Sequence, residues 1–200
     1  KIMDNNIQIV HSEEFIDKSE KITLQNRIND TAVPHTHQFI EIVYVYEGSG
    51  CHIINNHKYD LSPGDMLFIN YGQVHIIESD PSMNVVNILF LPEFISNSLM
   101  NSENVYDLFA FILSDELNNV FDFTAPVAHF TDSERTAIEN LIFQMLDEYN
   151  GKESNYRMTL KAYLQILICK MIRNIRKQEK LTQHVFLQKI SPEIINFNNI

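Results

Sequence analysis

Imidazole and carboxylate side chains are concentrated in residues 35–41, which read HTHQFIE, and a further histidine follows a turn-rich segment. Successive side chains of a β-strand point to opposite faces, so every second position from 35 to 43 would share one face if this stretch is extended. Two imidazoles and a carboxylate on that face, with a third imidazole from a neighbouring strand, can surround one cation. Imidazole and carboxylate ligands suit Zn, Fe, Ni, Cu or Mn. The candidate metal ligands are His35, His37, Glu41 and His75.

The same four side chains are open to two other interpretations. They can line a polar pocket that binds a small molecule without metal, or form an internal hydrogen-bonded network of purely structural value. In either case Glu41 needs partners, because an unpaired buried carboxylate is costly or becomes protonated. Phe39 and Val43 share the face of Glu41 by alternation. They are candidates for the pocket wall, and ordinary barrel core is an equally good interpretation of both.

Short runs rich in Val, Ile, Tyr and Phe fill the sequence between Ile22 and Leu91, with turn residues between them. Such runs predict β-strands, and many short strands at this spacing predict a β-sandwich or barrel. We predict strands over residues 22–28, 39–46, 51–55, 57–60, 66–70, 74–78 and 84–91.

After Pro92 the apolar period changes. Residues 131–134 (TDSE) form a candidate capping box for a first helix, which Asn150-Gly151 would end. We also predict a weakly patterned helix over 102–118 and a return to the sheet within 120–130.

A second long helix is predicted over residues 154–178, and its apolar arc is wide. A wide arc requires burial on more than one side of the helix. The helix either packs only on its partner helix and the barrel, or also packs on a second copy of the chain. We predict a homodimer interface that contains Leu160, Tyr163, Leu164, Leu167 and Met171.

Charge is distributed unevenly along the chain. The 200 residues carry a net charge of −11, with 5 basic and 18 acidic side chains in residues 1–130 and 10 and 8 in residues 131–200. This acidic balance argues against a nucleic-acid-binding surface, which would be basic.

We predict a cytoplasmic location from three features of the sequence. It has two cysteines, no apolar run long enough to cross a bilayer and no signal-peptide pattern. Both ends resemble cut ends, so we expect a fragment.

Two spaced motifs make the chain resemble the cupin superfamily. The first motif, His-x-His-x3-Glu-x6-Gly, is matched at every position and ends at Gly48. The second is matched at Gly64, Gly72 and His75, but Asn70 replaces a proline and Ser79 replaces an asparagine. The resemblance implies a mainly β fold with α, in which a double-stranded β-helix, or jelly-roll, barrel holds the four ligand-type residues where metallo-cupins bind metal.

Residues 35–75, the strand that ends in LFLPEF and the two amphipathic helices behind it resemble the N-terminal half of AraC-type bacterial transcription regulators. That resemblance implies a cupin-like effector-binding barrel over residues 1–130 and an antiparallel pair of α-helices for dimerisation over 131–180. It also implies that 181–200 is a linker or the start of a helix-turn-helix domain that is absent from these residues. DNA would be bound only through that absent domain.

Our leading hypothesis is therefore a sensor rather than an enzyme. A sugar or another small polar metabolite would bind near His35, His37, Phe39, Glu41, Val43 and His75, with or without one divalent transition metal such as Zn, Ni, Fe or Mn. The alternative is a metal-dependent cupin isomerase or dioxygenase that uses the same three histidines and Glu41, and a third hypothesis is a module that senses the metal itself.

No nucleophile triad or Gly-rich phosphate loop is present. His52 and His57 flank a predicted hairpin turn, so we expect them to be exposed or singly hydrogen-bonded.

Overall fold

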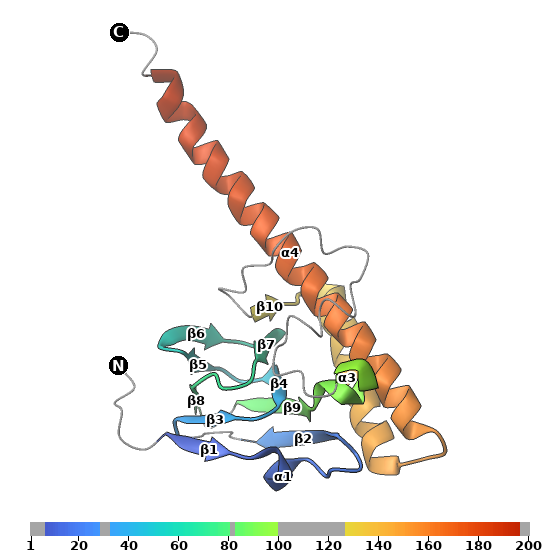
Figure 1. Cartoon of the computed structure of the whole chain (residues 1–200). Coiled ribbons are helices and arrows are strands. Elements are labelled where there is room, and N and C mark those ends of the chain that lie inside the picture. The colour runs from blue at the N-terminus through green and yellow to red at the C-terminus, as the bar shows by residue number, and fades with distance from the viewer. Residues whose placement is uncertain (1–6, 29–32, 81–82, 100–126, 197–200) are drawn as a thin grey trace.

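The computed structural model of this chain describes residues 7–28, 33–80, 83–99 and 127–196. Within those ranges, ten strands form two five-stranded sheets that enclose a barrel (Figure 1). One sheet has the order β1-β3-β8-β5-β6 and the other the order β10-β7-β4-β9-β2. The strands are β1 (Gln8–Val10), β2 (Ile22–Ile28), β3 (His35–His37), β4 (Ile40–Glu47), β5 (Gly50–Ile54), β6 (His57–Leu61), β7 (Asp65–Ile69), β8 (His75–Ser79), β9 (Asn84–Phe90) and β10 (Val127–His129).

All seven predicted strands are present with bounds shifted by at most one residue. The predicted return to the sheet is confirmed at β10, while 120–126 and the helix predicted over 102–118 lie outside the described residues. One detail was wrong: residues 35–43 are not a single strand. The chain bends at Gln38, so β3 joins the first sheet and β4 joins the second. The alternation rule therefore applies within each strand but not across the bend.

Strand β4 has two different faces. Glu41 and Val43 point between the two sheets, whereas Ile42 and Tyr44 belong to a core that the second sheet shares with the helices. Tyr44 is fully buried, and its hydroxyl donates a hydrogen bond to Glu139 Oε1 at 3.1 Å. The strand that carries the candidate site is thus packed directly against the helical layer.

Two long helices cover the outer face of the second sheet (Figure 1). They are α3 (Asp132–Gly151) and α4 (Tyr156–Asn196), which a short turn joins into an antiparallel pair. The shorter elements are α1 (Ser12–Phe15) and the 3-10 turns η1 (Pro92–Phe94) and η2 (Asn97–Leu99). No helix in the described ranges is both long enough and apolar enough to cross a membrane. A mainly β barrel followed by an antiparallel helix pair, the predicted class, is confirmed.

The first helix, α3, ends at Gly151 as predicted, but the cap at its start and the end of α4 differ from the sequence prediction. Thr131 is the N-cap residue of α3, but its side chain makes no capping hydrogen bond, and Glu134 instead pairs with Lys177 of α4 at 3.4 Å. The predicted capping box is therefore wrong. The second helix continues past residue 178 to Asn196. Residues 179–191 contain no glycine or proline to interrupt it, and Pro192 lies near its end.

The residues predicted to form a dimer interface lie inside this single chain. Four of the five are at most 1% exposed and belong to the core between the helices and the second sheet, and Tyr163 is half-buried against the same core. The four buried residues thus contact their own barrel and α3, and part of the Tyr163 side chain stays exposed. A homodimer interface at Leu160, Tyr163, Leu164, Leu167 and Met171 stays a prediction.

A polar contact anchors α4 to the edge of the second sheet. The carboxamide of buried Asn174 accepts from the backbone N–H of His129 at 3.0 Å and donates to its carbonyl at 2.9 Å. His129 Nδ1 lies 2.5 Å from Asp65 Oδ1, which links β10 to β7. Buried hydrogen bonds have strict geometry, so this contact determines where α4 lies along an otherwise apolar face.

We expect Gly64→Ala to destabilise the barrel. Gly64 has φ +102°, and an added Cβ would clash with the carbonyl oxygen of Phe130, whose N–H donates to the Gly64 carbonyl at 2.9 Å. Strain and clash together should cost at least about 2 kcal/mol, or a melting temperature roughly 4–8 °C lower. Gly72→Ala is the control, because φ is +69° but no atom lies within 4 Å of the added Cβ. Equal melting temperatures for the two variants would contradict the packing of Phe130 on Gly64.

Candidate functional site

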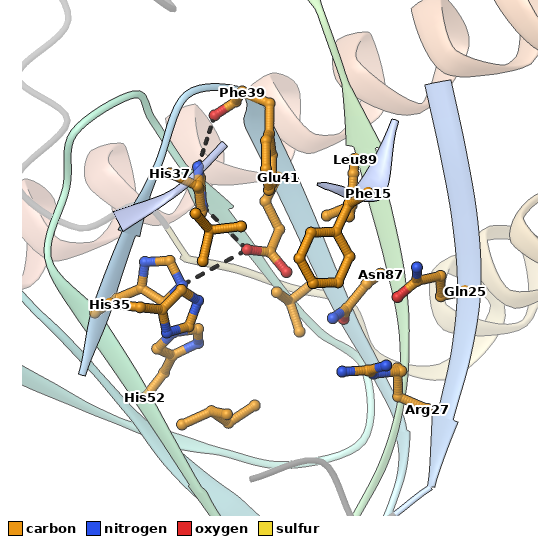
Figure 2. Close-up of a pocket in the computed structure, with 14 residues that line it drawn as sticks. Phe15, Gln25, Arg27, His35, His37, Phe39, Glu41, His52, Asn87 and Leu89 are labelled. Carbon is orange, nitrogen blue, oxygen red and sulfur yellow. Dashed lines mark hydrogen bonds and ion pairs between the residues drawn. The ribbon is translucent and has the colours of Figure 1, made fainter. Parts of the chain in front are cut away.

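A cavity lies between the two sheets, and all six predicted binding residues line it (Figure 2). The volume available to the centres of water molecules is about 80 Å³. One water needs about 10–15 Å³ by this measure, so the cavity has room for several waters or one small molecule. Besides His35, His37, Phe39, Glu41, Val43 and His75, the lining contains Val10, Phe15, Gln25, Arg27, His52, Ile77, Asn87 and Leu89.

Three of these side chains direct their ligand atoms at one point. The Nε2 atoms of His37 and His75 lie 3.2 Å and 3.7 Å from Oε2 of Glu41. All three residues are buried, and one ligand atom from each lies within 4.8 Å of the other two. The His37 ring stacks on Phe39 at a centroid distance of 4.2 Å, which holds the imidazole in place. This His-Glu-His group could bind a metal ion.

Backbone carbonyls determine which ring nitrogens carry hydrogen. Nδ1 of His37 lies 2.8 Å from the Phe39 carbonyl oxygen, and Nδ1 of His75 lies 3.3 Å from that of Gln73. Because a carbonyl only accepts, each Nδ1 is assigned as the donor. In a neutral ring Nε2 then carries a lone pair, and this lone pair points toward Glu41. Histidine ligands of metals are oriented in this way, with the second ring nitrogen donating to a carbonyl.

Burial and charge set the protonation states of the group. Burial alone would raise the pKa of Glu41, but the hydrogen bond with His37 and the neighbouring imidazoles outweigh it and lower the pKa to about 2. Burial also lowers the pKa of His75 to about 3. The ionised Glu41 carboxylate and the neutral His75 ring then face each other through acceptor atoms only. A cation between them, or a proton retained on an imidazole, removes that repulsion.

His35 lies outside the converging group. Its Nδ1 is 2.8 Å from the Val33 carbonyl oxygen, and its ring packs edge-on against His75 at a centroid distance of 4.1 Å. In the part of the chain that the structure describes, the metal-type group contains three of the four predicted ligands. His35 is the direct cross-strand neighbour of His75, and its ring packs against that ring and not against Glu41.

Sequence reasoning missed the polar wall opposite the imidazoles (Figure 2). Gln25 and Arg27 are alternate residues of β2, and Asn87 of β9 is the direct cross-strand neighbour of Gln25. The alternation in β2 was visible in the sequence. Its pairing with β9 was not, because cross-strand register depends on contacts between distant residues.

His52 was also missed, and the expectation of an exposed or singly bonded side chain is wrong. It is 2% exposed, and neither ring nitrogen has a hydrogen-bond partner among the residues described. Its ring lies 5.2 Å from that of His75 between centroids. Burial lowers the pKa of His52 to about 4, so the ring is neutral near pH 7. In a strand, the side chain at position 52 points to the opposite face from Cys51 and Ile53. This alternation was the only sequence signal for the inward orientation of His52.

Comparison with known proteins gives a consistent result. The family model described as the AraC-like ligand binding domain matches residues 23–167. The HTH-type transcriptional activator RhaR of Yersinia pseudotuberculosis serotype O:1b (strain IP 31758) is 40% identical over 73 residues, which cover 36% of this chain and 25% of the relative. RhaR of Salmonella arizonae is 30% identical over 92 residues, 46% of this chain and 33% of the relative. The matches thus span a quarter to a third of these relatives.

Among solved structures, a cupin protein from Bacteroides fragilis is similar to part of the chain. The likeness has a TM-score of 0.30 and 23% sequence identity, and it covers 35% of this chain and 64% of that protein.

Proposed function

Because the chain belongs to the AraC-like ligand-binding domain family, we propose that it is the effector-sensing region of a cytoplasmic DNA-binding transcription regulator and not an enzyme. The observation that carries this proposal is the cavity between the sheets, which joins a polar group of imidazoles and a carboxylate to apolar walls. Such a mixed lining suits a small polar metabolite, for example a sugar. DNA would be bound by a helix-turn-helix domain outside these 200 residues.

The two faces of β4 supply a route from the cavity to the helices. Glu41 faces the effector, while Tyr44, three residues on, faces α3 and hydrogen-bonds Glu139. An effector acts only through different affinities for two arrangements of the protein. Binding at Glu41 that shifts β4 would therefore bias how the helices sit on the barrel, and through α4 how the DNA-binding domain is held.

A thermal-shift screen of sugars, polyols and small acids tests the proposal. A ligand at 100 times its Kd stabilises the folded state by about 2.7 kcal/mol, which should raise the melting temperature by roughly 5–10 °C. Glu41→Gln should abolish that shift. Glu47→Gln is the matched control, because Glu47 lies on the same strand but is exposed and hydrogen-bonds Asn84. A hit that both variants bind equally would place the ligand outside the cavity.

A metal site is the second candidate, favoured by the acceptor atoms that converge at Glu41. His37, Glu41 and His75 would hold one divalent transition metal and leave coordination positions open to the cavity. The same group could serve a sensor of the metal or a cupin isomerase or dioxygenase. Metal binding is compatible with effector sensing, since the cavity extends beyond the three ligands.

We further propose a homodimer, formed by the outer face of α4 and not by the buried residues named above. Met158 is 68% exposed and Ile166 is 46% exposed, and exposed Ala162 lies midway between them. Residues four apart share a helix face, so the three form an apolar stripe that points away from the barrel. A second copy, packed antiparallel, would bury the same stripe on both chains.

A further inference from the structure

His52 lies in the middle of β5, and its side chain forms part of the cavity wall (Figure 2). Its neighbours in register are Tyr59 of β6 and Ile77 of β8. The charged or titratable groups that face it are Glu41, His35, His37 and His75, all of which line the same cavity. The ring is thus buried in the protein and bounded on one side by the cavity.

Both ring nitrogens of His52 are buried without a protein hydrogen bond among the described residues. Leaving a buried donor or acceptor unsatisfied costs about 1–3 kcal/mol, whereas an apolar ring of similar shape costs nothing of this kind. His37 and His75 differ from His52, because each has a backbone carbonyl at Nδ1. The His52 ring therefore has hydrogen-bonding capacity that no described residue uses, and the cavity is the side from which a partner can approach it.

We propose that His52 is a specificity-determining residue that binds the effector directly, through a hydroxyl group of the effector. This inference rests on the proposed effector function of the cavity. A neutral imidazole offers one donor and one acceptor, and a hydroxyl both donates and accepts. A carboxylate can only accept and an ammonium group can only donate, so each matches one nitrogen state at most. The effector class is a small hydroxylated molecule with one hydroxyl at His52 and another polar group near His37 and Glu41.

The first test needs no ligand. His52→Phe keeps an aromatic ring and removes both nitrogens, so it should raise the melting temperature of the free protein by roughly 2–8 °C. His52→Leu is the second apolar variant if the larger ring does not fit. His57→Phe is the matched control: His57 lies on the same hairpin but is exposed, and its replacement should leave the melting temperature unchanged. Lower melting temperatures for both apolar variants at position 52 would show a structural role and overturn the inference.

The second test measures binding of aldoses, alditols and the corresponding sugar acids to each variant. For any probe that binds the wild type, His52→Phe should weaken binding at least about tenfold, the equivalent of one hydrogen bond. His52→Gln retains a donor and an acceptor and should keep affinity within a few fold. A probe that Glu41→Gln abolishes but His52→Phe binds as tightly as the wild type would overturn the role of His52 and leave the effector function intact. If no probe binds the wild type, both fail.

Discussion

Leu164→Asp is expected to unfold the domain and not to release a folded monomer. Leu164 is fully buried in the core that α4 shares with α3 and the second sheet. A carboxylate there would be desolvated without a partner, which costs several kcal/mol, and the packing of the leucine would be lost as well. Domains are stable by only about 5–15 kcal/mol in total. Circular dichroism against temperature should show a melting temperature lowered by at least about 10 °C, or no cooperative transition.

Ile166→Asp is the matched control for that experiment. Ile166 lies two residues further along the same helix but is 46% exposed, so the variant should fold with nearly the wild-type melting temperature. If the outer stripe forms the dimer, Ile166→Asp should shift sedimentation from dimer to monomer, and Met158→Asp should do the same. A folded Leu164→Asp variant would contradict the packing of α4, and a dimer that survives both stripe substitutions would contradict the proposed interface.

The second large effect concerns divalent metal. Wild-type protein is expected to bind one Ni²⁺ or Zn²⁺ per chain in a calorimetric titration at pH 7.5. Removing one of three ligands, by His37→Ala, Glu41→Gln or His75→Ala, should weaken that binding at least about 100-fold. His35→Ala should weaken it less than about tenfold, because His35 lies in the same cavity but outside the converging group.

The His35→Ala variant distinguishes a metal group of three ligands from one of four ligands. A loss as large as that of His37→Ala would mean four ligands, as the sequence motif implies, and would require His35 to turn from Val33 toward Glu41. Wild-type protein that binds neither metal at 100 µM would contradict the metal site. A polar group of the effector would then be the partner of the converging Nε2 and carboxylate atoms.

Most of the barrel could be predicted from the sequence, because the patterns that mark a strand lie within a few consecutive residues. Alternation of apolar residues and the turn residues between the runs located seven strands to within one residue. The motif spacing also selected His37, Glu41 and His75 without any knowledge of the fold. Their convergence could be foreseen only through the family resemblance, since the distance between β4 and β8 is not encoded in either segment alone.

Local sequence patterns specify the presence of each described element and its apolar face. The residues that cover each apolar face depend on the tertiary structure. The wide arc of α4 required burial on several sides, but only the packed chain shows that Leu160 and Leu164 face the barrel while Ile166 remains exposed. His52 makes the same point for the site, because a lone histidine in an alternating strand does not reveal what surrounds it. Periodicity depends on neighbours a few residues apart, whereas packing and burial depend on residues brought together from distant parts of the chain.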